Sequence, residues 1–195
     1  MLKTTNMILS ELNTYASPAD KLGRLVKQGF YIPVARGLYA TEKTIPGYLL
    51  AGSIYAPSYL SFEYALAYYG MIPEAVYVYT SATFDKKKKK KFENAFGIYT
   101  YRDVPATVYP YGLKVIPEGE YSYIIATPEK ALCDQLYQVK AVRNYRELCH
   151  LLFDDLRIDE QELEKLNVSD ISLLAAKYSS TNVTKLAKWL GKRSK

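Results

Sequence analysis

Four basic residues near the start of the chain have the types and spacing needed to bind phosphate groups. Lys21, Arg24 and Lys27 recur every third residue in one predicted helix, and Arg36 follows in a predicted turn. Lysine and arginine neutralise phosphates, and a basic helix followed by a hairpin is one arrangement that binds DNA. Helix–hairpin units with a few surface cations also occur in proteins that bind no nucleic acid. Both interpretations stay open at this point.

A second group of cations is an unbroken run in the middle of the chain. Its members are Lys86, Lys87, Lys88, Lys89, Lys90 and Lys91. Six like charges repel one another, which favours an exposed, solvated loop between a strand ending near Phe84 and the region that begins at Phe92. The alternative is a loop that attracts an anionic partner such as nucleic acid.

No set of residues has the spacing of a catalytic or metal site. The chain has one histidine and no glycine-rich phosphate loop or zinc-binding helix motif. The adjacent acids Asp154 and Asp155 are more typical of helix ends than of paired catalytic carboxylates. Cys133 and Cys149 lie in apolar helical patterns, which predicts buried, unreactive thiols. We therefore expect a protein that is not an enzyme and needs no cofactor and no metal.

The first four cations depend on a short helix and a hairpin to position them. Ser17 can cap the helix, Pro18 suits its first position, and Gly29 can end it in a left-handed conformation. Arg36-Gly37 lies between two β-forming runs, which predicts a tight hairpin. The helix carries an apolar face of Leu22, Leu25 and Val26, against which a first helix within residues 4–14 can pack. This unit resembles an abbreviated winged helix.

The remaining chain predicts a mixed region followed by helices. The fold class is α+β, with a small N-terminal winged-helix-like unit, a mixed α/β middle with antiparallel strands, and a helical C-terminal part. We place the units at residues 1–45 and 46–195. Predicted helices cover 46–55, 61–69, 127–139, 144–156, 159–166, 169–178 and 183–190, and predicted strands cover 75–84, 97–104, 108–116 and 120–126.

Composition narrows the class of protein. The 195 residues carry a net charge of +6, to which the lysine run contributes most, so whole-chain basicity favours an anionic partner only weakly. No apolar stretch is long enough for a secretory signal or a membrane span, which predicts a cytoplasmic protein without a membrane partner. Residues 46–85 contain no lysine or arginine, which is typical of a core or a protein interface.

Three stretches, taken in order, resemble the AbiEi-type antitoxin family of type IV toxin–antitoxin systems. They are LVKQGFYIPVARGLYA at residues 25–40, YLSFEYALAYYGMIPE at 59–74 and IATPEKALCDQLY at 125–137. Each is a pattern of packing and turn residues, and the specificity comes from having all three in register. With the helical tail, the resemblance covers nearly the whole chain.

The resemblance implies two activities. An N-terminal winged helix would bind operator DNA and repress its own operon, with Lys21, Arg24, Lys27 and Arg36 as the contacts. A larger C-terminal domain would counteract a nucleotidyltransferase-like toxin without forming a stable complex with it. The alternative is a stand-alone interaction or regulatory protein whose winged unit is structural and binds no DNA.

Overall fold

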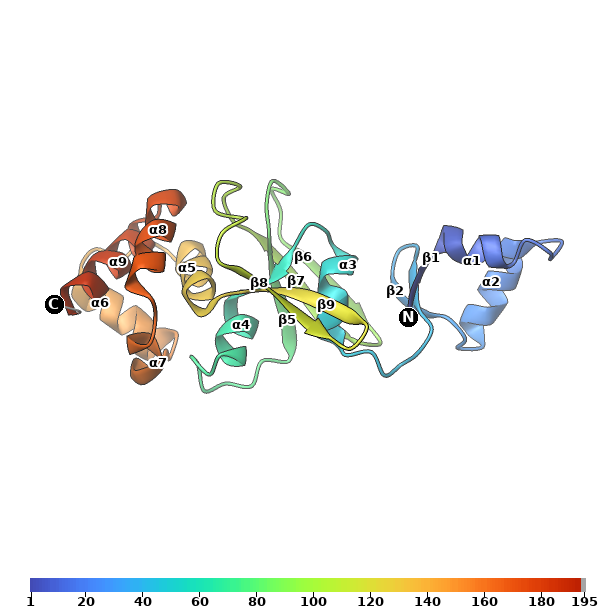
Figure 1. Cartoon of the computed structure of the whole chain (residues 1–195), viewed down its shortest axis with the longest axis horizontal. Coiled ribbons are helices and arrows are strands. Elements are labelled where there is room, and N and C mark those ends of the chain that lie inside the picture. Colours follow the sequence, from blue (N-terminus) through green and yellow to red (C-terminus); the bar gives the residue numbers. More distant parts are fainter. Residues whose placement is uncertain (194–195) are drawn as a thin grey trace.

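Two β-sheets divide the strands of this α+β protein. The computed structural model describes residues 1–193 and is elongated, with a small unit at one end, a six-stranded sheet in the middle and helices at the other end (Figure 1). The predicted fold class is confirmed. No helix within the described part of the chain is both long and apolar enough to cross a membrane.

The N-terminal unit combines two helices with a three-stranded antiparallel sheet of order β1-β3-β2. Its elements are β1 (Leu2–Thr4), α1 (Thr5–Glu11), α2 (Pro18–Lys27), β2 (Ile32–Ala35) and β3 (Leu38–Ala40). The two helices and the β2–β3 hairpin were predicted, whereas β1 was not. By pairing with β3, β1 completes the sheet of a winged helix.

The ends of α2 lie close to where the sequence places them. Ser17 occupies the N-cap position, but its hydroxyl donates to Asp20 (2.6 Å) instead of accepting from a backbone amide. Gly29 takes a φ of +80°, and the N–H of Phe30 then donates to the Leu25 carbonyl (3.0 Å). A left-handed residue followed by this bond is a common way for a helix to end.

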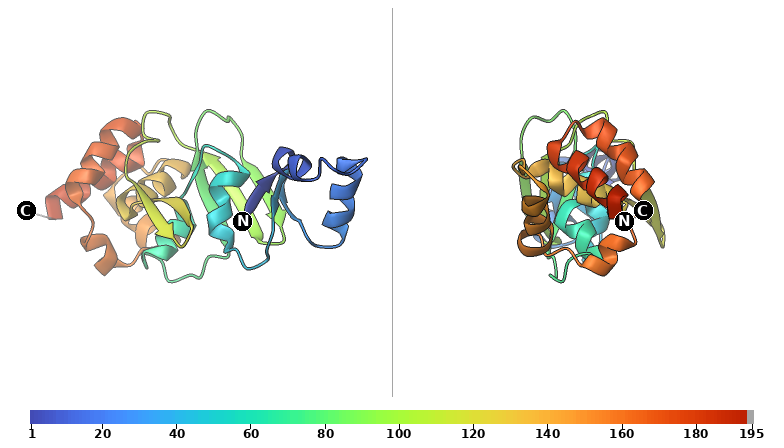
Figure 2. Two further views of the ribbon diagram at one scale, coloured as in Figure 1. Left: turned by 45° about the vertical axis from the view of Figure 1, so that its right-hand side comes forward. Right: turned by 90° about the vertical axis from the view of Figure 1, so that its left-hand side faces the viewer.

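The N-terminal sheet contributes to two cores. Helices α1 and α2 enclose a small one formed by Ile8, Leu12 and Leu22. Ile32 and Val34 of β2 belong instead to the large core that runs through the rest of the chain. The unit is therefore packed on the middle of the molecule through its sheet, while its helices project from the end (Figure 2).

The central sheet has the strand order β6-β7-β5-β4-β9-β8. Its strands are β4 (Tyr59–Leu60), β5 (Val78–Thr83), β6 (Lys90–Asn94), β7 (Gly97–Asp103), β8 (Leu113–Glu118) and β9 (Tyr121–Ala126). The β6–β7 and β8–β9 hairpins are antiparallel, as is β4–β5. The pairs β5–β7 and β4–β9 are parallel, so the sheet is mixed where only antiparallel strands were expected.

Three predictions for this region are wrong in detail. The lysine run is not a loop throughout, because Lys90 and Lys91 begin β6 and pair with Tyr101 and Thr100. The strand predicted at 108–116 starts only at Leu113, since residues 108–111 form turns. The helix predicted at 46–55 is a 3₁₀ turn (Gly47–Leu50) followed by the short α3 (Ala51–Ile54).

Helices cover the two faces of the sheet unequally. On one face of β7, the hydroxyls of Tyr99 and Tyr101 donate to the carbonyls of Gly47 (3.1 Å) and Ala51 (2.7 Å), which places α3 and its preceding turn there. On the other face, α4 (Phe62–Tyr68) lies beside β5, and its Tyr64 amide donates to Thr80 (3.0 Å).

The C-terminal part is helical, as predicted. It contains α5 (Pro128–Gln138), α6 (Tyr145–His150), a π-helical turn (Leu151–Asp155), α7 (Glu160–Glu164), α8 (Val168–Tyr178) and α9 (Thr181–Arg193). Side chains of Thr127, Asn144 and Asp159 cap α5, α6 and α7, as their residue types predict. The expected cap Ser169 is wrong, because Asn167 accepts the amide hydrogen bonds at the start of α8.

Candidate nucleic-acid interface

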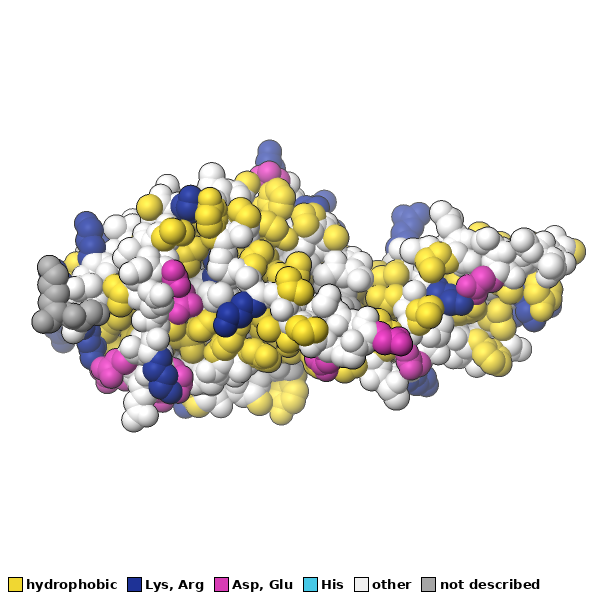
Figure 3. All heavy atoms as spheres, viewed as in Figure 1, with side chains coloured by type: hydrophobic (Ala, Val, Ile, Leu, Met, Phe, Trp, Pro, Cys, Tyr) yellow, Lys and Arg dark blue, Asp and Glu magenta, His cyan; other side chains and the backbone are white. Residues whose placement is uncertain are grey.

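The outward face of α2 carries two of the predicted phosphate-binding residues. Arg24 and Lys27 are exposed, and they share this face with the exposed Asp20 and Gly23, because residues three, four and seven apart align along a helix. The opposite face packs into the small core through Leu22. The space-filling view shows α2 within a lobe at the end of the molecule (Figure 3), where no other part of the chain lies in front of it.

Lys21 lies at the edge of this face and not at its centre. Its side chain is half-buried, and its ammonium group is 4.9 Å from the centre of the Tyr15 ring. A cation over an aromatic face is weakly held and still available to an anion. Lys21 can therefore add charge to the α2 surface but is partly engaged within the unit.

Arg36 comes from a different side of the N-terminal unit. It is exposed in the tight turn between β2 and β3, where Gly37 takes a φ of +76°. The Gly37 carbonyl accepts a hydrogen bond from the Thr5 amide (2.9 Å), which ties this turn to the start of α1. The structure thus brings Lys21, Arg24 and Lys27 together on α2, and it places Arg36 beside α1.

The acids of the N-terminal unit leave these cations unneutralised. Glu11 forms an ion pair with Lys3 (2.6 Å), and its hydrogen bond raises the pKa of Lys3. Glu42 pairs with the N-terminal ammonium (2.6 Å), whose hydrogen bond lowers the pKa of that carboxyl. Within residues 1–193, Lys21, Arg24, Lys27 and Arg36 have no ion-pair partner. The unit therefore presents net positive charge.

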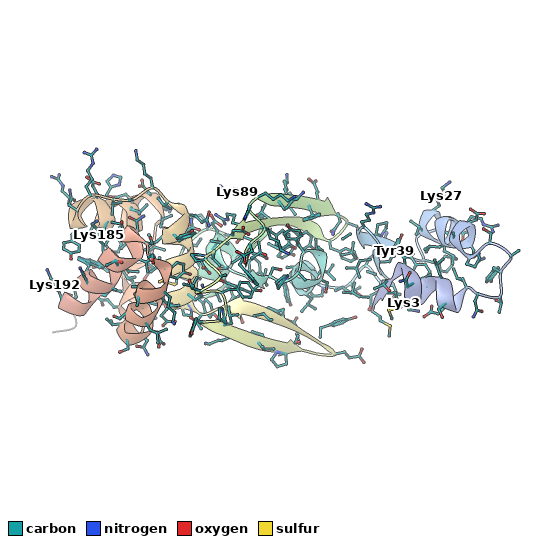
Figure 4. The ribbon with its side chains drawn as sticks, turned by 90° about the horizontal axis from the view of Figure 1, so that it is seen from above. Lys3, Lys27, Tyr39, Lys89, Lys185 and Lys192 are labelled. Carbon is teal, nitrogen blue, oxygen red and sulfur yellow. The ribbon has the colours of Figure 1, made fainter. Side chains whose placement is uncertain are left out.

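The lysine run lies far from α2. Figure 4 shows Lys89 over the middle of the molecule, while Lys27 marks the N-terminal end and Lys192 the other. Lys86 is half-buried, with its ammonium donating to the Ala56 carbonyl (3.1 Å) and 5.1 Å from the centre of the Tyr55 ring. The backbone amide of Lys87 donates to Asp103 (2.6 Å). The start of the run is therefore held in place by neighbouring elements.

A buried polar cluster, which sequence reasoning missed, lies where α5 meets the central sheet and α8. We call it the Asp134 cluster. Ser61 (2.6 Å) and Tyr59 (3.0 Å) donate to one oxygen of Asp134. Lys130 (3.1 Å) and Tyr178 donate to the other oxygen, and Lys130 also donates to the Tyr178 hydroxyl (2.6 Å).

The Asp134 cluster is enclosed. The side chains of Lys130 and Asp134 are 0% exposed. Burial lowers the pKa of Lys130, and burial together with the Asp134 carboxylate raises the pKa of Tyr59 and Tyr178. The sequence does contain a signal for it, because Lys130 and Asp134 are four residues apart in a helix that is otherwise apolar on the same side. In this structure the cluster connects three elements.

Other chemistry finds little support in the described residues. No group of three or more His, Cys, Asp or Glu side chains within residues 1–193 is arranged to hold a metal ion. Cys133 is buried, as predicted, and burial raises the pKa of its thiol. Cys149 is only half-buried. No protein-family model matches this sequence, and no curated protein matches it significantly.

Proposed function

We propose that this protein is a DNA-binding autorepressor and the antitoxin of an AbiEi-type toxin–antitoxin system. The observation that carries the DNA-binding half is the outward face of α2, where Arg24 and Lys27 stand unpaired at the free end of an elongated molecule. The antitoxin half rests on the sequence resemblance, and its counterpart is a nucleotidyltransferase-like toxin that is counteracted without a stable complex.

The dimensions of α2 suit binding in a groove. It has ten residues, which is enough to lie across the edges of several base pairs in a major groove. Gly23 leaves the centre of its exposed face without a side chain, so a partner surface can approach the backbone closely. Arg24 and Lys27 on either side of this gap would contact phosphates or base edges.

The two middle stretches that resemble the antitoxin family meet in the Asp134 cluster. Tyr59 and Ser61 come from the stretch at 59–74, whereas Lys130 and Asp134 come from the stretch at 125–137. Residues far apart in sequence are thus joined by one set of hydrogen bonds. This contact gives a structural reason for the two stretches to occur together, and it supports the resemblance without bearing on the toxin.

The alternative function is a protein-interaction or regulatory domain with a structural wing. One observation favours it: Ile32 and Val34 of β2 are buried in the large core, and the Asn94 side chain donates to the Val34 carbonyl (2.8 Å). The hairpin therefore has a packing role whether or not it contacts DNA. A nucleotidyltransferase-like reading frame directly downstream would favour the antitoxin, and its absence would favour the alternative.

Binding to the DNA upstream of its own coding sequence tests the repressor. We expect Arg24→Ala, Lys27→Ala and Arg36→Ala each to weaken binding, and removing one phosphate-binding cation should reduce the salt slope of log K by about 0.9. Fluorescence anisotropy over a range of salt concentrations measures both quantities. Lys165→Gln serves as control, because that exposed lysine is already paired with Glu162 on α7. A folded protein that binds this DNA at no salt concentration would refute the repressor.

A further inference from the structure

A groove lies on the face of the central sheet that α4 leaves partly open. Its floor is formed by β5 and β7, one end by residues 75–77 before β5, and the other by residues 89–91 at the start of β6. Its volume is about 720 Å³. This size lies within the range of small-molecule sites in proteins.

The groove is hollow because α4 covers only part of this face. Thr80 is bonded to the Ser61 carbonyl (2.6 Å) at the covered end, whereas Val78 and Thr100 remain half-exposed. Glu63 of α4 forms a bidentate ion pair with Arg102 of β7, and the Arg102 guanidinium lies 3.9 Å from the centre of the Phe62 ring. Although burial opposes it, this pairing lowers the pKa of Glu63. The acid in the groove is thus neutralised.

The two ends of the groove differ in chemistry. At one end the Tyr77 side chain is 86% exposed, which is unusual for an aromatic residue and leaves both ring faces free for a ligand. At the other end three consecutive lysines line the groove, and the only ion pair they make within the described residues is between Lys91 and Glu93 (3.7 Å). An exposed ring and unneutralised ammonium groups thus face one apolar hollow.

We propose that this groove binds a nucleotide, with its base against the apolar floor and Tyr77 and its phosphates at Lys89, Lys90 and Lys91. Bases stack on exposed aromatic rings, and ammonium groups neutralise phosphates. An apolar hollow with a cationic end matches a ligand that is planar and uncharged at one end and anionic at the other. This site is separate from α2 and does not depend on operator binding.

The lysines of the groove have two competing roles that leave Tyr77 without a function. Lysines on an edge strand such as β6 prevent pairing with another chain, and in that role they need no ligand. An acidic peptide would also be attracted to the lysines, but it would gain nothing specific from Tyr77. The contribution of Tyr77 to binding therefore separates a nucleotide from both.

Calorimetric titration of the full chain tests the proposal. The ligands are adenosine and guanosine triphosphate, a short single-stranded oligonucleotide, inorganic triphosphate and a polyglutamate peptide. We expect Tyr77→Ala to weaken nucleotide binding by about tenfold or more, since one base–aromatic stack contributes at least that factor. The triple variant K89Q/K90Q/K91Q should weaken it similarly and remove most of its salt dependence. If the oligonucleotide binds more tightly than the triphosphates, the source is the end of a single strand; the reverse order indicates a free nucleotide.

The matched control is K185Q/K188Q/K192Q, which removes the same charge from α9 at the far end of the molecule. It should leave nucleotide binding unchanged, and all these variants should still bind the promoter. Four outcomes would overturn the proposal: a folded protein that binds no nucleotide, equal affinity for inorganic triphosphate, equal loss in the α9 control, or tighter binding of polyglutamate that displaces nucleotide.

Discussion

Four donors converge on the Asp134 carboxylate, which is fully buried. A buried charge is tolerated only when it is paired and its remaining lone pairs are hydrogen-bonded. Lys130 supplies the opposite charge, while the hydroxyls of Tyr59, Ser61 and Tyr178 complete the set. This satisfied cluster explains why two ionisable residues can lie on the buried side of α5.

The Asp134 cluster predicts opposite outcomes for single and double substitutions. Asp134→Asn leaves the Lys130 charge without its partner in the interior, so the free energy of unfolding should fall by about 3–5 kcal/mol. K130M/D134L removes both charges and keeps an apolar fill, and it should lose much less. Urea denaturation measures both variants. A double variant as unstable as Asp134→Asn would show that the hydrogen bonds, and not the unpaired charge, determine the effect.

At the scale of elements, α2 contains one residue that packing within the chain does not require. Gly23 lies in the middle of the helix, and no atom lies within 4 Å of where a Cβ would stand. Glycine in a helix interior is less favourable than alanine by about 1 kcal/mol. The helix therefore accepts this loss without an internal steric reason, which fits a surface that meets a partner closely.

Gly23 predicts separate effects on stability and DNA binding. Gly23→Ala should raise the free energy of unfolding of the N-terminal unit by about 1 kcal/mol, because alanine restricts the unfolded chain and favours helix. Gly23→Glu should leave the fold intact but prevent promoter binding, since it adds bulk and negative charge to the groove-facing side. Ala176→Glu on the exposed side of α8 controls for the added charge. Unchanged promoter binding by Gly23→Glu would show that another surface contacts the DNA.

Elements with local capping signals could be predicted from the sequence, whereas others could not. Thr127, Asn144 and Asp159 mark helix starts because their side chains bond the first free amides, and Gly29 marks an end because it adopts positive φ easily. For the candidate interface, these local rules suffice to place Arg24 and Lys27 on one helix face.

The missed features depend on contacts between distant residues. Strand β4 has only two residues, and it is a strand because β5 and β9 pair with it on either side. Lys90 and Lys91 join β6 because β7 offers its free edge, which outweighs repulsion between neighbouring ammonium groups. Likewise, the burial of Lys130 depends on Tyr178, 48 residues further along the chain.

At the scale of the whole molecule, a few polar side chains connect the sheet to the C-terminal helices. The buried Asn182 side chain of α9 donates to the carbonyls of Leu136, Val139 and Lys140 at the end of α5 and accepts from the Val142 amide (2.9 Å). Tyr178 of α8 joins the Asp134 cluster on the same helix. Helix α5 is thus the element through which the two parts of the large core are held together.

The tyrosines make the stability of the whole molecule sensitive to high pH. Burial, with smaller effects from neighbouring tyrosines, raises the pKa of Tyr99 and Tyr101 well above the ordinary 10.0, and it raises that of Tyr69 to about 12. In the unfolded chain these hydroxyls lose their protons near pH 10, whereas in the folded protein they keep them. Their contribution to stability is therefore fully present below pH 10 and is lost as the pH rises further.

We therefore expect the free energy of unfolding to fall steeply above pH 10. Each fully buried tyrosine contributes up to about 1.4 kcal/mol per pH unit to this slope. Lys130 acts in the opposite direction, because its lowered pKa makes its contribution rise with pH up to its ordinary value of 10.5, but it is one group against several tyrosines. Urea denaturation at pH 8 and above pH 10 measures the change. Tyr101→Phe should reduce the slope by one group while losing its hydrogen bond to Ala51, worth about 1 kcal/mol. A slope unaltered by Tyr101→Phe would mean that this hydroxyl titrates alike in both states.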